Sequence, residues 1–522
     1  MVKSIVIAGG GSAGWMTAAY LSKHLDGVDI TLIESSDIPV VGVGESTITP
    51  IVQFMNAMGL EETDWMPQCN ATYKSAIGFK NFHRVGDPHM WYTFEPMAVI
   101  EGRPMSRYWY RQHLADDVNF DRFSFYDYCY VGPELCRQGK TLRSMVDKGP
   151  AYHLDAGLLG ELLSRIGISN GVTRVIDDIR GVKRHEDGRI AALERENGPD
   201  LEADLFIDCT GFRALLMDGA LEEPFNSYNE SLFNDKAIAI RYPYEDPDRE
   251  MFSYTNCTAQ SSGWIWQIPL YHRVGSGYVY SSAHKSPDEA ELELRQFIGE
   301  ERTKDLDTNH INIRVGKHRR TWVKNCVAIG LASGFIEPLE STGLLIVQVQ
   351  IESLARTIAA KNDFNAGDRA VYNQITTDLY EGIRDFLVCH YALTEREDSA
   401  YWRDVKFNTV IPDSAAERMR LARMALLDVP MLGQFERPNF GDYSFTDGWQ
   451  AILIGMNHMP LAMNQFQNVG PNDPVVVQNM AQAEQRRRQM ERFKVQEMAR
   501  FPSHYEYLST HIHQPEPLAT AL

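Results

Sequence analysis

The sequence feature that most constrains the fold is a glycine-rich loop near the start of the chain. Residues 4–8 (SIVIA) predict a buried parallel strand, and residues 9–14 (GGGSAG) open a helical run. Gly9, Gly11 and Gly14 have GxGxxG spacing. In that spacing the first glycine permits a tight turn, the second lets backbone approach a pyrophosphate, and the third lets the helix pack on the strand. The loop therefore predicts a dinucleotide site in an α/β, Rossmann-like fold.

The segment that follows supports this prediction. Residues 29–33 (DITLI) predict a second strand, and Glu34 comes directly after it. A carboxylate at that point accepts hydrogen bonds from ribose hydroxyls. Ser12 and Ala13, inside the loop, are expected among the cofactor-binding residues. NAD and FAD share this fingerprint, so it does not choose between them.

The choice of cofactor depends on segments far along the chain. Residues 203–213 (ADLFIDCTGFR) and 326–330 (CVAIG) each begin as an apolar strand. A nucleotide-binding domain assembled from such distant segments resembles FAD-binding monooxygenase-type folds more than compact NAD domains, so FAD is expected, with Ile329 and Gly330 beside it. This predicts a discontinuous FAD-binding domain (1–75, 150–220 and 320–360), insertions over the active site (76–149 and 221–319) and a mostly helical substrate-binding module (361–522).

Composition narrows the classes of partner. The chain has 522 residues and a net charge of −19, which argues against nucleic acid and anionic membrane surfaces. Its seven cysteines are scattered without a CxxC pair, so neither a metal site nor a disulfide framework is predicted. Reduced cysteines and the lack of a run of about 20 apolar residues predict a cytoplasmic protein without a membrane partner. Small molecules or other proteins are the expected partners.

A second chemical opportunity lies within residues 325–349, where an apolar strand leads into a helix that starts near Gly343. Free amides and the positive end of the helix dipole at Thr342 and Gly343 can hold a small anion. Glu340 stands directly before them. The alternative is that Glu340 and Ser341 merely cap the helix, and this stretch taken alone favours the cap.

Three further segments are ambiguous by themselves. Residues 71–82 predict one strand, with Lys74 on the face opposite Tyr73 and Ile77, and a lysine so placed is usually a solvated charge. Trp264 and Trp266 alternate within residues 263–270, a pattern usual for core residues. Residues 39–50 predict a flexible connector that could lie along the flavin. The connector contributes four candidate cofactor contacts: Val43, Gly44, Glu45 and Ser46.

Together these segments resemble the flavin-dependent tryptophan halogenases over nearly the whole chain. The motifs that carry the resemblance are GGGSAGWMTA at 9–18, VGVGEST at 41–47, ATYKSAIGF at 71–79, DLFIDCTGFRALL at 204–216, GWIWQIPL at 263–270, GFIEPLESTG at 334–343 and PSHYEYL at 502–508. The WxWxIP signature combined with GxGxxG is specific to that family.

The resemblance implies an enzyme that uses FADH2, O2 and chloride or bromide to make hypohalous acid at the flavin. Lys74 matches the lysine that receives this oxidant, and Glu340 matches the carboxylate beside it. Thr342 and Gly343 match the amides that bind halide. Trp264 and Trp266 match the tryptophans that keep substrate away from the flavin. Since no separate NAD(P)H fingerprint is present, the expected partner is a separate flavin reductase, and a homodimer is compatible with the sequence.

Substrate is where the match is weakest. Tyr92, Phe94 and Trp449 fall where the family holds an indole between rings, and Ser341 is expected to contact the substrate as well. The enzymes of the family that act on free tryptophan carry a tyrosine pair and a glutamate that grip the charged amino-acid backbone. Here the segment reads RPNFGDYSFTDGW at 437–449, with only Tyr443 and with Asp442 or Asp447 in place of a clear glutamate. We expect indole or an indole-bearing compound to be a better substrate than free tryptophan.

Two alternatives remain open at this point. A flavin-dependent aromatic hydroxylase would share the nucleotide site but would need neither halide nor Lys74. A flavoprotein that binds partners or senses redox state without catalysis would need no substrate pocket.

Overall fold

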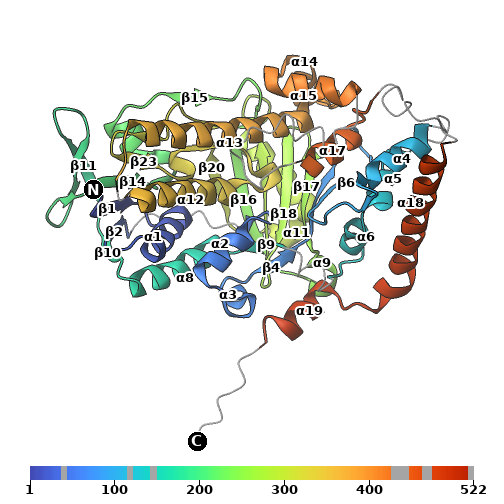
Figure 1. The fold of residues 1–522 in the computed structure, drawn as a ribbon, viewed down its shortest axis with the longest axis horizontal. Helices are drawn as coiled ribbons and strands as arrows, with labels where there is room; N and C mark the ends of the chain where they lie inside the picture. The colour runs from blue at the N-terminus through green and yellow to red at the C-terminus, as the bar shows by residue number, and fades with distance from the viewer. Residues whose placement is uncertain are drawn as a thin grey trace, which may run out of the picture.

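The nucleotide fingerprint lies at the centre of a six-stranded sheet in the computed structural model (Figure 1). The structure describes residues 1–36, 44–114, 121–141, 150–361, 363–424, 446–460 and 473–514. Neighbouring strands of this sheet are parallel except for the last pair, which is antiparallel. Their order is β10 (Thr173–Ile176), β2 (Asp29–Glu34), β1 (Ser4–Ala8), β14 (Leu205–Asp208), β23 (Cys326–Ala328) and β22 (Trp322–Val323). The predicted strands are confirmed, and segments far apart in the chain form one sheet.

Helices cover this sheet. The helix α1 (Ser12–His24) follows the glycine loop and contacts α8 (Ala156–Ser169) and α12 (Gly343–Lys361), and α12 in turn packs on α13 (Ala366–Ala392). The predicted start of a helix at Gly343 is confirmed. By length and composition α12 could cross a membrane, but 67% of the window that passes this test is buried inside the protein, as in a core helix.

A second, seven-stranded sheet stands beside the first. Its strands run in the order β20 (Thr308–Asn312), β16 (Lys236–Tyr242), β19 (Val274–Tyr280), β18 (Gly263–Pro269), β17 (Tyr254–Gln260), β5 (Ala76–Lys80) and β6 (Met90–Thr93). On β18, Trp264, Trp266 and Ile268 belong to one core cluster, whereas Ile265 belongs to another on the opposite face. The predicted alternation along this strand is therefore confirmed.

The sequence prediction was wrong about residues 71–82, which form two strands in two sheets. The first, β4 (Thr72–Lys74), pairs with β9 (Ala151–Leu154) in a three-stranded sheet that also holds β3 (Glu45–Ser46), and the second is β5. The break falls at Ser75, whose amide donates to the Ser253 carbonyl and whose carbonyl accepts from the Phe94 amide. Because the Ser75 amide and carbonyl form hydrogen bonds with these other segments, β4 and β5 do not join into one continuous strand.

The flexible connector predicted at 39–50 also differs in the structure. Gly44 and Ser46 to Ile48 are buried, and β3 pairs with β9. The glycines that suggested flexibility instead allow a tight path, since Gly44 has a φ of +106°. Residues 39–43 of this segment, with Val43, lie outside the described residues.

The remaining elements complete the covering layers. The strands are β7 (Val99–Ile100), β8 (Arg103–Pro104), β11 (Ile179–Arg184), β12 (Ile190–Arg195), β13 (Leu201–Glu202), β15 (Phe225–Ser227), β21 (Gly316–His318) and β24 (Gly334–Phe335). The helices are α2 (Ile51–Met58), α3 (Glu62–Gln68), α4 (Met105–Leu114), α5 (Ser124–Cys129), α6 (Gly132–Arg137), α9 (Pro247–Glu250), α10 (Pro287–Ile298), α11 (Glu300–Thr303), α14 (Ala400–Asn408), α15 (Asp413–Met424), α17 (Thr446–Gly455), α18 (Pro474–Arg492) and α19 (His504–His511). Short 3-10 or π turns are η1 (Gly211–Arg213), η2 (Leu215–Ala220), η3 (Gly330–Ala332), η4 (Pro338–Glu340), η6 (Phe493–Glu497) and η7 (Met498–Arg500).

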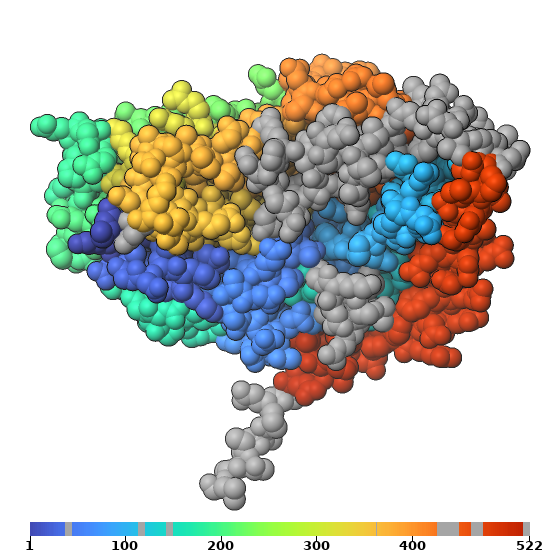
Figure 2. Space-filling model, in the orientation of Figure 1, coloured from blue at the N-terminus to red at the C-terminus, as the bar shows by residue number. Residues whose placement is uncertain are grey.

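The C-terminal part is mostly helical in the described residues, as predicted. Figure 2 shows α18, in red, along the edge of the molecule opposite the N-terminal sheet. The division of the chain into the three predicted units stays a prediction.

A buried carboxylate joins the second sheet to the turn before α12. Oε2 of Glu337 accepts hydrogen bonds from Trp264 Nε1 (2.9 Å), Asn234 Nδ2 (2.8 Å) and the Tyr391 hydroxyl (2.8 Å). Burial raises the pKa of Glu337, and these three donors act against that rise. Because Glu337 directly precedes η4, it fixes that turn to β18 and α13.

The contribution of the Trp264–Glu337 hydrogen bond to stability can be measured by comparing the two tryptophans of β18. Trp264→Phe removes a donor to a buried carboxylate, whereas Trp266→Phe removes an Nε1 that is buried without a partner in the described part of the chain. We expect Trp264→Phe to lower the free energy of unfolding by about 1.5–3 kcal/mol more than Trp266→Phe, since both variants lose ring volume and one also loses the bond. Denaturant titration of the two variants measures the difference, and equal losses would contradict the role given to Glu337.

Candidate active site

The glycine loop packs tightly against the protein at Gly9 and Gly14 and has open space at Gly11. A Cβ on Gly9 would lie 2.3 Å from the Cys209 carbonyl oxygen, and one on Gly14 would lie 1.9 Å from the Gly9 oxygen. A Cβ on Gly11 would meet nothing within 4 Å. Gly11 is also the N-cap of α1 and offers no side chain, so the first amides of that helix are not capped from within the loop. This open cradle at a helix N-terminus fits the pyrophosphate of FAD.

Glu34 is held in place at the end of β2. Its Oε1 accepts a hydrogen bond from Arg174 Nε at 2.5 Å. Its Oε2 lies so close to Gly10 that a Cβ there would come within 1.6 Å of it. One oxygen is thus occupied by Arg174 and the other faces the glycine loop, where a ribose hydroxyl could reach it. Arg174 was not foreseen, because nothing in the sequence shows that β10 lies beside β2.

The other predicted cofactor residues serve the shape of the cradle. The Gly330 amide donates to Gln350 Oε1 (2.9 Å), and the Ile329 amide donates to the Asp208 carbonyl (3.0 Å). A Cβ on Gly330 would lie 2.8 Å from the Ala13 Cβ, so this glycine lets α1 approach. Their backbone donors are therefore used inside the protein, and Gly330 contributes space.

Two of the predicted cofactor contacts, Glu45 and Ser46, are held inside the protein. Burial raises the pKa of Glu45 to about 7. The Ser46 hydroxyl accepts a hydrogen bond from the Ser341 hydroxyl at 3.0 Å and lies 2.6 Å from Thr255 Oγ1. Ser46, predicted to contact the flavin, therefore directs its side chain toward the lysine site.

Lys74 is fully buried, so its interpretation as a solvated charge is wrong. Its Nζ donates to the Thr47 carbonyl and to Ser341 Oγ, each at 2.8 Å, and lies 5.0 Å from the centroid of the Phe94 ring. Burial lowers the pKa of Lys74 to about 7, although nearby Cys257 and Glu340 act in the opposite direction. Near neutral pH the side chain therefore exists both as ammonium and as amine.

Ser341 turns the chain between η4 and α12. Its φ of +58° lies in the left-handed region, which costs energy in a residue other than glycine and is common at functional sites. The hydroxyl accepts from Lys74 and donates to Ser46. The interpretation of Ser341 as a helix cap is therefore wrong, since both of its hydrogen-bonding functions serve the lysine site.

Glu340 is buried beside a histidine that the sequence analysis did not identify. Its Oε1 lies 2.8 Å from Nε2 of His390 on α13, and both side chains are fully buried. His390 Nδ1 contacts the Phe386 carbonyl at 3.1 Å and must donate to it, so Nε2 carries no hydrogen in the neutral ring. One proton must then lie between Glu340 and His390. A single histidine within a helical pattern carries no motif that could have revealed this pair.

The second carboxylate oxygen of Glu340 has no hydrogen-bond partner among the described residues. Burial raises the pKa of Glu340, while His390 and Lys74 lower it. The group is therefore a buried carboxyl with one oxygen available to accept a proton.

The start of α12 has the properties of a small-anion site. The Thr342 carbonyl accepts the first helical hydrogen bond, from Ile346, at 3.1 Å. The amides of Thr342 and Gly343 donate to no other described residue, and the buried Thr342 hydroxyl likewise has no partner in the described ranges. A Cβ on Gly343 would meet nothing within 4 Å. Free donors, open space and the dipole of a 19-residue helix fit a halide.

The predicted substrate rings gather around a further phenylalanine, Phe386. Tyr92 lies 5.6 Å from Phe94 and 6.2 Å from Phe386, and Phe386 lies 5.3 Å from Trp449, between ring centroids. Phe94 connects this aromatic group to Lys74. Asp442 and Tyr443 lie outside the described residues, and so does the side chain of Asp447. The grip on an amino-acid backbone is therefore not part of the described site.

Trp264 and Trp266 are both buried, with ring centroids 6.2 Å apart. Trp264 donates a hydrogen bond to Glu337, and this bond fixes the turn that carries Glu340. Their predicted separation of substrate from flavin stays a prediction.

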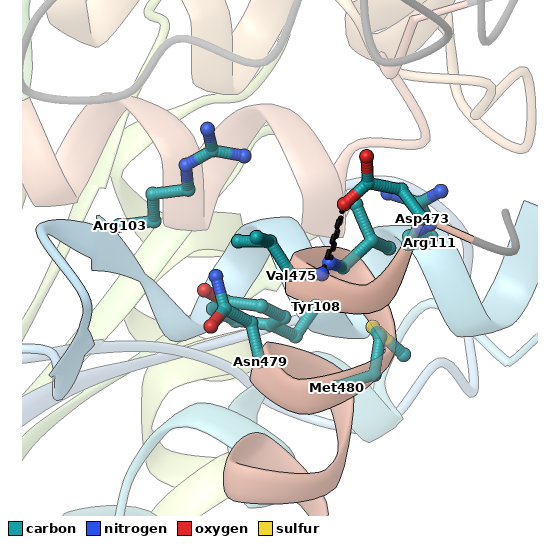
Figure 3. Close-up of a pocket in the computed structure, with 8 residues that line it drawn as sticks. Arg103, Tyr108, Arg111, Asp473, Val475, Asn479 and Met480 are labelled. Carbon is teal, nitrogen blue, oxygen red and sulfur yellow. Dashed lines mark hydrogen bonds between the residues drawn. The ribbon is translucent and has the colours of Figure 1, made fainter. Parts of the chain in front are cut away.

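A separate cavity of about 270 Å3 lies between α4 and α18 (Figure 3). Its lining includes Arg103, Tyr108, Arg111 and Asp473, which caps α18 through the Val475 amide. Figure 3 shows Arg111 beside Asp473, with Arg103 on the opposite side. None of the predicted site residues lines this cavity, so it is distinct from the lysine site.

The chain is similar to proteins of known activity. The sequence profile of the family described as Tryptophan halogenase matches residues 4–472. Tryptophan 6-halogenase SttH of Streptomyces toxytricini is 38% identical over 97% of both chains. 7-chloro-L-tryptophan 6-halogenase KtzR of Kutzneria sp. is 40% identical over 81% of this chain and 86% of its own. The structure of Xcc4156, a flavin-dependent halogenase from Xanthomonas campestris, is 34% identical and superimposes with a TM-score of 0.86 over 99% of this chain and 100% of that one.

The burial of Lys74 should be measurable as a dependence of stability on pH. Its pKa is about 7 in the folded protein and about 10.4 in the unfolded chain, so between these values the unfolded chain holds a proton that the folded protein lacks. The stability contribution of Lys74 therefore rises with pH over this window. Lys74→Met should stabilise the protein at pH 7, and this gain should shrink toward pH 10 by up to about 1.4 kcal/mol per pH unit.

Chemical unfolding of wild type and variant across pH 6–10 measures the effect. Lys80→Met replaces an exposed lysine of the neighbouring strand and should give a difference that does not change with pH. A Lys74→Met gain that is the same at pH 7 and pH 10 would show that the lysine is not buried in this way.

Proposed function

Because this chain belongs to the tryptophan halogenase family, we propose that it halogenates an indole ring with hypohalous acid directed by Lys74 and Glu340. Enzymes of this family are flavin-dependent and use FADH2, O2 and halide to halogenate aromatic rings. The observation that carries the assignment to these two residues is the position of Lys74. It is buried, and it is hydrogen-bonded to Ser341, the residue that directly follows Glu340.

The cofactor and halide would occupy the two helix N-termini. FAD would lie on Gly9, Gly11 and Gly14, with its pyrophosphate at the first turn of α1 and its ribose at Glu34. When bound, reduced FAD together with O2 supplies the oxidising power that converts chloride or bromide into hypohalous acid. The halide would rest at the amides of Thr342 and Gly343, which have no other partner among the described residues.

Lys74 can hold the oxidant in either of two protonation states, because its pKa is about 7. As an ammonium it donates a hydrogen bond to hypohalous acid, and as an amine it attacks the halogen and forms a haloamine with release of water. Two of its hydrogens point to the Thr47 carbonyl and to Ser341 Oγ. The third position on Nζ is left for the oxidant, so the side chain is oriented before the oxidant arrives.

Glu340 completes the substitution. After the ring has accepted the halogen, the ring carbon must lose a proton before aromaticity returns. The free oxygen of Glu340 can accept that proton, and the proton shared with His390 adjusts how basic the carboxylate is. A general base of this kind contributes about 10²- to 10⁴-fold.

An electron-rich planar substrate is supported by the aromatic group Tyr92, Phe94, Phe386 and Trp449. The two curated relatives compared above are named for tryptophan or a chlorotryptophan. This chain carries a single tyrosine and aspartates at 437–449, where the family grips the amino-acid backbone. Indole or an indole-bearing compound without a free zwitterion therefore fits this site better than tryptophan.

A separate flavin reductase supplies FADH2 to enzymes of this family. No second nucleotide fingerprint is present in the sequence, which supports the same requirement here. The homodimer and the cytoplasmic location stay predictions.

Removing the lysine tests the proposed function. Lys74→Met should lower the yield of halogenated product by more than about 100-fold, while oxidation of reduced flavin continues, because the oxidant is still made but no longer held. The assay supplies FADH2 from a reductase, air and bromide, and mass spectrometry detects the isotope pattern of the halogenated arene. Lys80→Met is the matched control and should retain the wild-type yield. An unchanged yield with Lys74→Met, or a hydroxylated product formed without halide, would favour the aromatic hydroxylase instead.

The substrate preference is tested by direct comparison. Indole and free tryptophan, at equal concentration with the same reductase and halide, should give a higher kcat/KM for indole, because the charged amino-acid backbone loses water without gaining partners. Equal or better turnover of free tryptophan would defeat this part of the proposal and leave the halogenase assignment intact.

A further inference from the structure

A continuous line of buried polar groups leads from Lys74 through His153 on β9 to the Pro269 carbonyl on β18, and the proposed halogenation does not account for it. From Ser341 Oγ the line continues to Ser46 Oγ (3.0 Å), Thr255 Oγ1 (2.6 Å), His153 Nε2 (2.9 Å) and, from the other ring nitrogen, to Thr72 Oγ1 (3.3 Å) and the Pro269 carbonyl (2.6 Å). Strands β3, β4, β9, β17 and β18 each contribute one member.

These side chains are almost completely shielded from solvent. Ser46 is 7% exposed, Thr255 and Ser341 are each 2% exposed, and Thr72 and His153 are not exposed. A hydroxyl that is shielded from water must donate its one hydrogen to another member of the line, because a buried donor without a partner is unfavourable.

The carbonyl end of the line fixes the direction of every hydrogen bond. The Pro269 carbonyl can only accept, and Thr72 has a single hydroxyl hydrogen to donate. Thr72 must therefore donate to Pro269 and accept from Nδ1–H of His153, which leaves Nε2 of that ring as an acceptor for Thr255. Thr255 accepts from Ser46, Ser46 accepts from Ser341, and Ser341 accepts from Lys74. Each hydroxyl then donates once and accepts once.

Burial supports the neutral state of the histidine that this pattern requires. It lowers the pKa of His153 well below its usual value, and Lys74 and His504 lower that pKa further. The ring is thus held as the Nδ1–H tautomer by Thr72 on one side and Thr255 on the other.

We propose that His153, Thr255 and Ser46 are positioning residues that hold the Ser341 hydroxyl as an acceptor toward Lys74 and keep the third position on Nζ open. This inference rests on the proposed role of Lys74. While the direction of the line is maintained, Ser341 cannot donate to the lysine. If Thr255 is lost, Ser46 can turn and donate to Ser341, and Ser341 can then donate to the lone pair of the Lys74 amine. That hydrogen bond would occupy the position that the oxidant requires.

Two substitutions at one position separate the hydroxyl from the packing. Thr255→Val removes the hydroxyl with little change of shape and should lower halogenated product per flavin oxidised by about tenfold, as expected when a reacting group is misoriented. Thr255→Ser keeps the hydroxyl and should stay within about twofold of wild type. Thr258→Val replaces another buried threonine, on the opposite face of β17, and should also stay within about twofold.

A measurement on the wild-type protein tests the direction of the line without activity. In a spectrum of the 15N-histidine-labelled protein, His153 should be neutral and protonated at Nδ1, whereas free imidazole side chains favour Nε2–H. Its signals are identified by their absence from the His153→Gln spectrum.

The outcomes are distinct. Loss with Thr255→Val, retention with Thr255→Ser and an Nδ1–H tautomer would establish the proposal. Three results would overturn it: a His153 that is charged or protonated at Nε2, a Thr255→Val variant with the wild-type yield of halogenated product per flavin oxidised, or a Thr255→Ser variant that loses as much of this yield as Thr255→Val does. A wild-type protein that halogenates no arene would overturn the proposed function instead, and the tautomer would then decide by itself whether the line has this direction.

Discussion

The site depends on burying a lysine amine where strands from two sheets meet a turn. Removing an ammonium from water costs several kcal/mol, so Lys74 is stable there only because Thr47 and Ser341 accept its hydrogens and Glu340 lies nearby. Lys74 and these partners come from three separate segments, near residues 47, 74 and 341 of the chain. The lysine environment therefore exists only when the small sheet, the second sheet and the turn before α12 are assembled together.

The turn is the least tolerant part of this assembly. Ser341 is held in the left-handed region, and such a conformation persists only where its surroundings determine it. Glu337 fixes the turn on one side through Trp264 and Tyr391, and Lys74 fixes it on the other through Ser341. The strained residue thus lies between two buried ionisable groups, and their hydrogen bonds fix the start of α12 relative to the lysine.

Local patterns predicted much of the fold, and long-range contacts account for what they missed. The glycine loop, the strands β1, β2, β14 and β18 and the start of α12 follow from period and spacing, which neighbouring residues determine. The break at Ser75 follows from Ser253 and Phe94, which no local pattern reveals. The proximity of Lys74 to Glu340 came from the family resemblance alone, and the hydrogen bond from Lys74 to Ser341 was not predicted. Local patterns could not predict three pairings, because each joins residues that are distant in the chain: Glu340 with His390, Glu34 with Arg174, and Ser46 with Thr255.

The choice of lysine and the state of the nearby thiol follow from the same burial. Arginine in this place would remain charged and could only donate hydrogen bonds, whereas a lysine with a pKa of about 7 also offers an amine lone pair. Cys257 faces the same pair of charges, and burial raises the pKa of its thiol well above the usual value. A thiolate would react with hypohalous acid faster than the protonated thiol does, because the thiolate is the nucleophilic form of cysteine. Excluding water from this pocket therefore makes the lysine more nucleophilic and the cysteine less so, and this difference would favour the halogen transfer proposed for Lys74 over loss of halogen to sulfur.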